Sequence, residues 1–427
     1  MKKAVAFILT LAMMFSMAIG TAAQAEDKVI TWVFWDDLTA TDDLITKGYK
    51  EVIDRFNAAD NGYTCQVITT NLEEYDAKMA ALIASGQTPD VWICNPGPNM
   101  DVYVNADLCM DLTGILDANP EWRDSFSGGI FERLTYDGKI MAIPTNFAAA
   151  CCFYNTEMFE KAGVEVPTNF AELLAACEKL QAAGFQPITC SAGTAWCLSM
   201  VAGYLCDRCG GPDNLVAVSE GASTWSAEPS YANAGNKLVE LSKYFQKTAA
   251  SDTNDECVAQ FYNEQAAILI QGSWVIAQIN GANPAFEEKC GVFQFPAVEG
   301  GADPNRMIVK TDNLLVSKNT QNIDGVVELL KYFTDDAAQK YTAEVGGKIP
   351  VTNVQVDYEK APKQLSFVMD ILSNMTGTFG FYNESLASVE AGDVFDNSMV
   401  SIVLGQKTVE QALQGIDNFY TDNVWGK

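Results

Sequence analysis

The chain contains no histidine, and this absence limits its chemistry more than any other feature of its composition. Histidine is the commonest general base in enzymes and the commonest protein ligand of metals. Serine or cysteine nucleophiles activated by histidine are therefore excluded, and so are zinc sites built on imidazole. Iron would have to be held by tyrosine and carboxylate groups alone. We predict no metal site and no cofactor.

Basic residues are also scarce: 27 Lys and Arg stand against 55 Asp and Glu, and the formal net charge is −28. An acidic surface of this kind repels phosphate backbones and anionic lipid headgroups. We therefore predict no nucleic-acid partner and no membrane-surface partner. A polyanionic ligand is disfavoured for the same reason, whereas the charge places no restriction on a neutral ligand.

Long apolar runs are absent except at the N-terminus. There Lys2 and Lys3 precede an apolar stretch over residues 4–19, and Ala23-Gln24-Ala25 follows. This order is typical of a signal peptide, here residues 1–25, cleaved after Ala25. A retained membrane anchor is the alternative, but the run is short for a bilayer span. No cysteine lies at the cleavage site to carry a lipid, so we expect export to the periplasm or the cell exterior.

Twelve cysteines follow the predicted signal peptide, an even number that permits disulfides in an exported protein. Cys206 and Cys209 form the sharpest local pattern. A disulfide is the preferred interpretation of this pair, ahead of free thiols or a metal site, because no second cysteine pair at metal-ligand spacing is present. Cys151 and Cys152 fall in a predicted strand, where neighbours point to opposite faces, so we expect two buried thiols there.

Strands and helices alternate from residue 29 onward, which predicts a mainly parallel sheet covered on both faces. Ligands of such sheets bind beyond the carboxyl ends of the strands. Trp35, Asp36, Asn95 and Asn146 each follow a predicted strand and should share one edge. In the first half we expect strands over 29–35, 63–69 and 91–94, with a helix over 75–85 and another that buries Ile45, Tyr49, Val52, Ile53 and Phe56.

The segment from Gly138 to Leu180 is the most informative part of the chain. A short strand ends at Pro144, the polar pair Thr145-Asn146 follows, and a second strand ends at Asn155. A helix then ends at Gly163, and Pro167-Thr168 opens a longer helix with one apolar stripe. The chain beyond it continues with strands and helices and ends in a tail from Gln364 that we expect to be almost wholly helical.

Several short motifs occur in a fixed order along the chain, and together they resemble family 1 of the extracellular solute-binding proteins. Proteins of that family are the ligand-capturing subunits of bacterial ABC sugar importers. The motifs that carry the resemblance are Ile30-Thr31-Trp32, Tyr75-x-x-Lys78, Ser85-Gly86-x-x-Pro89-Asp90-Val91, Asp111-Leu112-Thr113, the Gly138 to Leu180 segment, Ala266-Ala267, Gly272-Ser273-Trp274 and Gly346-x-x-Ile349-Pro350.

The resemblance implies an α/β fold of the two-lobed periplasmic-binding-protein type II, with a ligand cleft between two lobes of mainly parallel sheet flanked by helices. Lobe 1 would comprise residues 26–146 and 312–346, and lobe 2 residues 147–311 and 347–427. The chain would bind a sugar or oligosaccharide, deliver it to the membrane permease of an ABC importer and catalyse nothing. No long linker separates the lobes, so we expect short crossings and a monomer.

Two departures from the best-known maltose-binding members bear on the ligand. Those members carry a carboxylate a few residues beyond the hinge proline, where this chain has Phe147-Ala148-Ala149. They also carry a charged pair after the third strand, where this chain has Pro96-Gly97-Pro98-Asn99. The resemblance therefore favours a sugar but argues against malto-oligosaccharides.

A sugar presents an apolar face and a rim of hydroxyls, so its site should combine aromatic rings with Asp and Asn side chains. Trp274, which follows a Gly-Ser turn, is the leading candidate for stacking, with core packing as its alternative. Trp196 has the same two interpretations. Asp36 is either a hydroxyl acceptor or a turn residue, and the asparagines are either ligands or ordinary loop residues. The predicted ligand-binding set is Trp35, Asp36, Tyr75, Asn95, Asn146, Trp196, Trp274, Tyr382 and Asp393.

Two other functions remain open on the sequence. The same fold can bind a polyol, a polyamine or a short peptide, and an acidic cleft would favour a polyamine. A secreted glycosidase would need two carboxylates about 5–10 Å apart across the cleft. Asp36 and Asp37 are adjacent and tend to point apart, and spacing singles out no other pair.

Overall fold

The computed structural model describes residues 28–39, 43–72 and 74–426, so the predicted signal peptide lies outside the described residues. One large sheet runs through the molecule in the strand order β2-β1-β3-β10-β6-β8-β7, with β11 paired to β10 and β9 paired to β6. Its strands are β1 (Lys28–Phe34), β2 (Tyr63–Thr69), β3 (Val91–Cys94), β6 (Ala142–Asn155), β7 (Gln186–Thr189), β8 (Ala266–Gly272), β9 (Cys290–Phe293), β10 (Arg306–Val316) and β11 (Gly377–Phe379).

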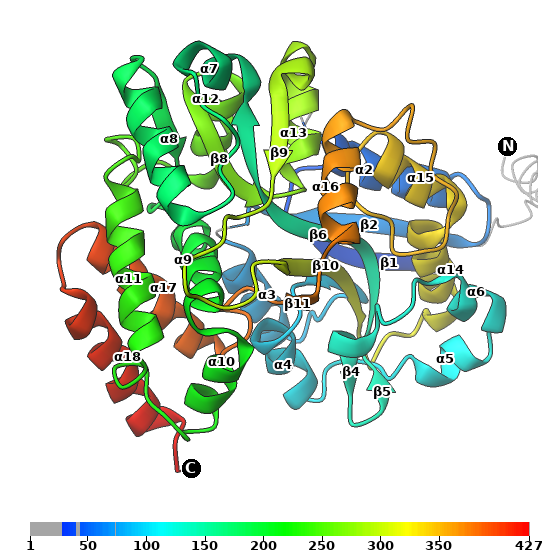
Figure 1. Cartoon of the computed structure of the whole chain (residues 1–427). Helices are drawn as coiled ribbons and strands as arrows, with labels where there is room; N and C mark the ends of the chain where they lie inside the picture. The colour runs from blue at the N-terminus through cyan, green and yellow to red at the C-terminus, as the bar shows by residue number, and fades with distance from the viewer. Residues whose placement is uncertain (1–27, 40–42, 73, 427) are drawn as a thin grey trace, which may run out of the picture.

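The helices form two groups, one toward each end of this sheet. Figure 1 shows α8, α9, α11, α17 and α18 on one side and α2, α14 and α15 on the other, with β6 and β10 between them. No helix in the described part of the chain is both long and apolar enough to span a bilayer. The α-helices are α2 (Leu44–Asn57), α3 (Tyr75–Ala84), α4 (Pro98–Asn105), α5 (Thr113–Asp117), α6 (Pro120–Ser125), α7 (Thr156–Ala162), α8 (Phe170–Ala182), α9 (Ala195–Gly210), α10 (Pro212–Ser219), α11 (Pro229–Ser242), α12 (Asn254–Tyr262), α13 (Val275–Ala282), α14 (Ile323–Thr334), α15 (Asp336–Glu344), α16 (Lys363–Ser373), α17 (Val389–Val403) and α18 (Val409–Asn423). Two 3-10 helices, η1 (Glu132–Leu134) and η2 (Pro284–Lys289), and a small hairpin of β4 (Thr135–Tyr136) and β5 (Lys139–Ile140) complete the elements.

Local sequence signals explain where the helices begin and end. Helix α2 begins after Asp43, whose carboxylate accepts hydrogen bonds from the backbone N–H groups of Ile45 and Thr46. Helix α7 ends at Gly163, which adopts the left-handed conformation (φ 61°) that glycine tolerates best. The predicted buried face of α2 is confirmed, because Ile45, Tyr49, Val52, Ile53 and Phe56 are all buried.

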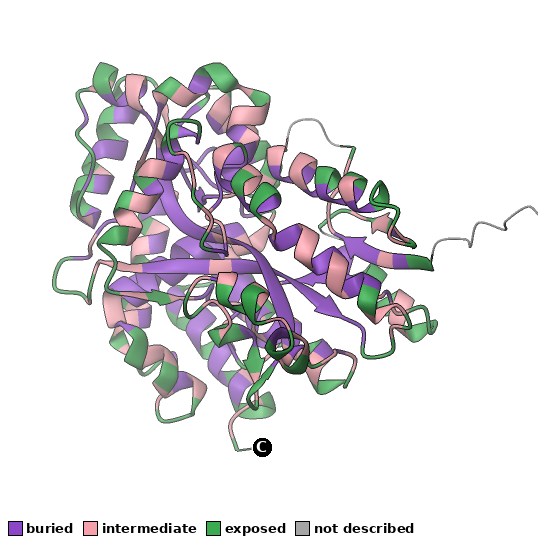
Figure 2. Ribbon diagram, turned by 90° about the vertical axis from the view of Figure 1, so that its right-hand side faces the viewer, coloured by how far each residue is buried: buried purple, intermediate pink, exposed green. Residues whose placement is uncertain are grey.

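The two longest strands, β6 and β10, lie side by side in the middle of the sheet, where the sequence predicts the hinge. The sequence predicted two short strands separated by a polar pair, but β6 is continuous from Ala142 to Asn155 and almost wholly buried (Figure 2). The polar pair stays in the strand because β10 runs antiparallel beside it. The register shifts between Asp312 and Asn313, which face Asn146 and Pro144, so that Thr145 bulges out.

The sheet is mixed rather than mainly parallel. Strand β1 pairs in parallel with β2 and β3, and β7 pairs in parallel with β8, as β-α-β order predicts. The pairs β10–β3, β10–β6, β6–β8 and β6–β9 are antiparallel. The α/β prediction is confirmed, and the error is confined to the strands that cross between lobes. The tail from Gln364, expected to be almost wholly helical, contains α16, α17 and α18 and also the short strand β11.

The described residues contain two main hydrophobic cores, one on each side of the predicted hinge. One core contains Trp32, Trp92 and Phe333, and the other contains Phe159, Tyr204 and Phe395. The predicted lobe boundaries at 146/147 and 311/312 fall beside the bulge and stay a prediction. Residues 351–353, which the prediction gives to lobe 2, hydrogen-bond to residues 125–127, which it gives to lobe 1.

All twelve cysteines are free thiols, so the disulfide preferred for Cys206 and Cys209 is wrong. Both lie on α9, Cys206 buried in the lobe 2 core and Cys209 half-buried. The prediction for Cys151 and Cys152 is confirmed, because both are buried and they belong to different hydrophobic clusters on opposite faces of β6. Burial raises the pKa of the Cys151 thiol to about 12, so it is unreactive at neutral pH.

Candidate functional site

Lys310 of β10 lies where the two lobes meet. Its ammonium group is 5.8 Å from the ring centroid of Trp35 in lobe 1 and 5.5 Å from that of Trp274 in lobe 2. It also donates a hydrogen bond to Asn95 Oδ1 (2.8 Å) and lies 3.6 Å from Asp312 Oδ1. Both distances to the rings are within cation–π range. Lys310 therefore connects two indole rings that belong to different lobes.

Trp274 forms an aromatic cluster with Trp196 and Phe381. The centroid of Trp274 is 6.0 Å from each of the other two rings, and Trp196 and Phe381 are 6.3 Å apart. Trp274 occupies the N-cap position of α13, two residues after the end of β8. Its indole lies against Gly272, where an added Cβ would be 2.0 Å from the ring. Glycine at position 272 is thus required for this ring position. Trp196 and Trp274 are both partly exposed, unlike a core tryptophan such as Trp32.

Trp35 occupies the opposite side of Lys310, just beyond β1. Its ring makes an edge contact with Tyr75 at 5.5 Å. Tyr75 itself is buried, and its hydroxyl donates to the backbone carbonyl of Ile93. Tyr75 therefore supports the ring of Trp35 rather than presenting a free hydroxyl.

Asn146, predicted to face the ligand, instead belongs to a buried polar network at the hinge. Its Nδ2 donates to Asp312 Oδ2 (2.9 Å) and to the hydroxyl of Tyr49 (2.7 Å). Lys348 Nζ forms an ion pair with the same Asp312 oxygen at 2.9 Å. Burial alone would raise the pKa of Asp312, but the ammonium groups of Lys348 and Lys310 more than offset this and lower it. Asp312 is therefore a carboxylate held ionised in the interior.

Carboxylates line both sides of the lobe junction. Burial raises the pKa of Asp36, and the carboxylates of Asp43 and Asp255 add to the shift. Asp36 also accepts hydrogen bonds from the Asp37 backbone N–H and the Thr46 hydroxyl, which fits its alternative role as a turn residue. Asp255 lies in the first turn of the lobe 2 helix α12, so the Asp36–Asp255 repulsion acts between the lobes.

A second repulsive pair acts at α3 and α17. Burial raises the pKa of Asp393, and the nearby carboxylates of Glu390 and Asp76 raise it further. Asp76 and Asp393 are solvent-exposed, yet enough protein surrounds each to disfavour its charge. Two exposed carboxylates that are nevertheless partly desolvated are expected where the surfaces of two lobes face each other.

A turn at residues 381–384, hereafter the bridging turn, contacts both lobes. Its Phe381 packs on Trp196 and Trp274 of lobe 2. At its other end, the backbone carbonyl of Glu384 accepts a hydrogen bond from Arg133 Nη2 of lobe 1 (3.4 Å). The same carbonyl lies so close to Gly97 of lobe 1 that a Cβ added there would be 2.2 Å from its oxygen. Tyr382, predicted to touch the ligand, is fully buried between Tyr231 and Phe395 and belongs to the lobe 2 core. Phe381, its neighbour, holds the position beside the tryptophans.

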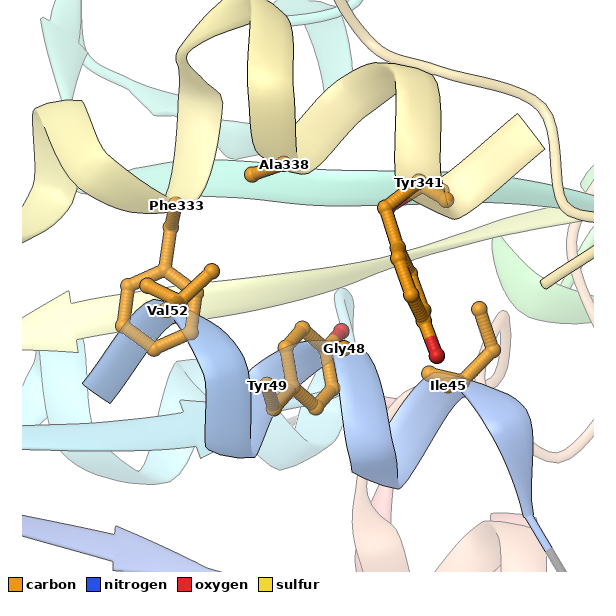
Figure 3. Close-up of a pocket in the computed structure, with 8 residues that line it drawn as sticks. Ile45, Gly48, Tyr49, Val52, Phe333, Ala338 and Tyr341 are labelled. Atoms are coloured by element: carbon orange, nitrogen blue, oxygen red, sulfur yellow. The ribbon is translucent and has the colours of Figure 1, made fainter. Parts of the chain in front are cut away.

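Two cavities lie away from the aromatic cluster. One holds about 10 Å³ between α2, α14 and α15, where Ile45, Tyr49 and Val52 face Phe333, Ala338 and Tyr341 (Figure 3). It has room for no more than a water molecule. The other is an open groove of about 510 Å³ on lobe 1, lined by residues 69–71, 74, 77 and 78. Neither brings aromatic rings and hydrogen-bonding groups of both lobes together.

The structure thus brings Trp35, Asp36, Asn95, Trp196, Trp274 and Asp393 to the lobe junction, and it places Tyr75, Asn146 and Tyr382 behind that surface. Sequence reasoning missed Lys310 and Glu384. Lys310 directly follows the apolar run Met307-Ile308-Val309 in β10, which could have marked it, whereas nothing local distinguishes Glu384. Among the described residues, no three cysteine or carboxylate side chains are grouped as a metal site would require.

Comparison with known proteins identifies the family. The model of the bacterial extracellular solute-binding proteins matches residues 42–340. The chain belongs to this family. This confirms the resemblance read from the motifs, and the members it matches are binding proteins.

Individual relatives are distant but match over most of their length. A multiple sugar-binding protein of Streptococcus mutans is 22% identical over 79% of each chain. An sn-glycerol-3-phosphate-binding periplasmic protein of Yersinia pseudotuberculosis is 23% identical over 89% of each chain. A solved structure titled chitin oligosaccharide binding protein superposes with a TM-score of 0.82 at 22% identity, covering 91% of this chain and 98% of its own. This superposition confirms the two-lobed fold of solute receptors.

Proposed function

We propose that this protein captures an uncharged sugar or oligosaccharide at the lobe junction and delivers it to the membrane permease of an ABC importer. The observation that carries the proposal is the arrangement of Trp35 and Trp274 on either side of Lys310. An indole face suits the C–H face of a pyranose, and two such faces in different lobes suit a ligand held between them. The family and the sugar-binding relative support the same ligand class.

Polar groups around the rings supply the hydrogen bonds that hydroxyls need. Asn95 and Lys310 lie beside the indoles, and the carboxylates of Asp36 and Asp393 stand on the two walls. Carboxylates accept charge-assisted hydrogen bonds from hydroxyls, often two at once. In this proposal Trp35, Asp36, Asn95, Trp196, Trp274 and Asp393 contact the ligand. Tyr75, Asn146 and Tyr382 hold these groups in place.

Ligand capture follows from the hinge. Strands β6 and β10 connect the lobes, and a ligand that contacts both lobes favours the closed arrangement over the open one. Affinity of this kind is typically micromolar, about −8 kcal/mol. The outer surfaces of the closed lobes would then dock on the permease. The proposal includes export after cleavage of residues 1–25, a monomeric state and no catalytic step.

A polyamine is the second candidate, because Asp36, Asp255, Asp76 and Asp393 give the junction an excess of carboxylates. The same carboxylates disfavour glycerol phosphate, the ligand named for one relative, although Lys310 and Arg133 are present. Aromatic faces of both lobes favour a sugar over a polyamine. Peptides, polyols and glycoside hydrolysis have no comparable observation in their favour.

A thermal-shift screen of residues 26–427 tests the proposal. The panel contains neutral mono- and oligosaccharides, polyamines and glycerol 3-phosphate. A ligand at 100 times its Kd should stabilise the fold by about 2.7 kcal/mol. We expect shifts with neutral sugars, none with glycerol 3-phosphate and no turnover of any oligosaccharide. Shifts with polyamines alone would reject the sugar assignment, and hydrolysis products would reject a pure binding function.

A further inference from the structure

Four buried polar atoms without hydrogen-bond partners surround the inner side of the bridging turn. They are Asp396 Oδ1, Asn383 Oδ1, Glu384 Oε2 and Ser199 Oγ. Buried polar atoms are almost always hydrogen-bonded, so several unpaired acceptors in one place indicate that a proton or another donor is missing from the group. The group connects three elements, because Ser199 lies on α9, Asp396 on α17 and the other two residues in the turn.

Asp396 is the central member of this group. Its Oδ2 accepts a hydrogen bond from Asn383 Nδ2 at 3.1 Å, and its side chain is nine-tenths buried. As a carboxylate, it would leave its own Oδ1 and the Asn383 Oδ1 as two acceptors without a donor. A proton on Asp396 supplies a donor to this group of buried acceptors, while Asp396 Oδ2 keeps its bond from Asn383.

The charges that face Asp396 favour the same protonated form. Glu384 of the bridging turn and Asp393 on the same helix are both acidic, and Ser199 and Asn383 are its polar neighbours. Burial is the largest cause that raises the pKa of Asp396, to about 7, and the two neighbouring carboxylates add to it. Polar contacts with Ser199 and Asn383 oppose the shift only in part.

The bridging turn links this acid to the proposed ligand site. Asn383 lies between Phe381, which packs on Trp196 and Trp274, and Glu384, whose carbonyl meets Gly97 and Arg133 of lobe 1. The backbone of the turn is closed by the bond from Glu384 N to Phe381 O at 3.1 Å. Moving Asn383 therefore moves both the ring beside the tryptophans and the contact between lobes.

We propose that protonated Asp396 is a positioning residue that anchors the bridging turn, so that ligand affinity falls when Asp396 loses its proton. The inference rests on the proposed function for its ligand but not for the movement of the turn. Ionised Asp396 repels Glu384, Asp393 and the Asn383 oxygen, and this repulsion loosens the seat of Phe381 on the two tryptophans. Mildly acidic conditions thus hold the site in its binding arrangement.

Affinity for a neutral oligosaccharide from the screen, measured by calorimetry between pH 5.5 and 8.5, tests the proposal. We expect the wild type to lose about tenfold in affinity over this range, which corresponds to one unit of difference in pKa between free and bound protein. Asp396→Asn keeps an amide donor in place of the acid proton and should bind equally at both pH values. Glu390→Gln, which removes an exposed carboxylate from the same helix, is the matched control and should retain the pH dependence.

Tryptophan fluorescence of the ligand-free protein separates this inference from the proposed function. We expect an emission change with a midpoint near pH 7 in the wild type and in Glu390→Gln, and none in Asp396→Asn or in Trp274→Phe. These emission changes would support the inference even if no sugar binds. A wild-type emission that does not change between pH 5.5 and 8.5 would overturn it, as would a change that persists in Asp396→Asn.

Discussion

Removing the negative charge of Asp312 should lower the free energy of unfolding, because it breaks the buried ion pair between Asp312 and Lys348. In Asp312→Asn the side-chain shape is kept, and one oxygen can still accept from Asn146. The ammonium group of Lys348, only 8% exposed, loses the carboxylate that lies 2.9 Å away. Breaking one side of a buried ion pair costs about 3–5 kcal/mol, because the remaining charge stays buried and unpaired. We expect a loss near the lower limit, about 3 kcal/mol, since Lys310 keeps Asn95 as a partner.

Urea denaturation at pH 7, monitored by circular dichroism, measures this loss. Asp54→Asn is the matched control, because Asp54 forms an exposed ion pair with Lys50 on α2 and should cost at most about 0.5 kcal/mol. The double variant Asp312→Leu/Lys348→Met removes both charges and should recover most of the loss. A cost below about 1 kcal/mol for Asp312→Asn would refute the claim that Lys348 depends on this carboxylate.

The same ion pair also makes the free energy of unfolding depend on pH in the acidic range. The folded-state pKa of Asp312 is lowered from its ordinary value, so its contribution to the free energy of unfolding is fully present above about pH 4. That contribution is lost as the pH falls through the folded-state pKa. The Asp312→Asn variant should therefore show a weaker loss of stability on acidification than the wild type.

Three further substitutions or measurements test other parts of the account. Gly272→Ala should reduce sugar affinity at least about tenfold, as Trp274→Ala should, because the new Cβ occupies the indole position. Gly415→Ala, with its nearest neighbour at 3.9 Å, should change nothing. Calorimetric titration of both variants decides this, and normal affinity in Gly272→Ala would contradict the placement of Trp274. Thiol titration without reductant should find twelve thiols after unfolding and mainly Cys209 in the native protein; fewer than twelve would reveal disulfides. Gly97→Ala should weaken binding, because its new Cβ would be 2.2 Å from the Glu384 carbonyl oxygen and would push the bridging turn away. An unchanged Kd would exclude a role for this contact.

Much of the fold could be predicted from the chain. The apolar stripe of α2 and the Gly163 stop of α7 are local signals, and the structure follows both. The hinge could not be predicted in the same way. Thr145 and Asn146 look like a break between strands, and they stay in β6 only because Asp312, far away in sequence, supplies their partners.

The candidate site shows the same limit. Trp274 could be found because glycine and serine precede it at the end of a strand. Tyr382 and Phe381 are adjacent aromatic residues, and only the packing of the turn decides that Phe381 faces the tryptophans while Tyr382 enters the core. Lys310 gains its importance from Trp35, Asn95 and Trp274, which the fold gathers from three separate strand ends.

A crystal structure of residues 26–427 with the neutral oligosaccharide that gives the largest thermal shift tests the central claim most directly. The account predicts a sugar ring stacked on the indole of Trp274, with Trp35 and Lys310 contacting the same ligand from the other lobe. A sugar bound in the groove at residues 69–78, or on one lobe without contact to Trp274, would contradict it.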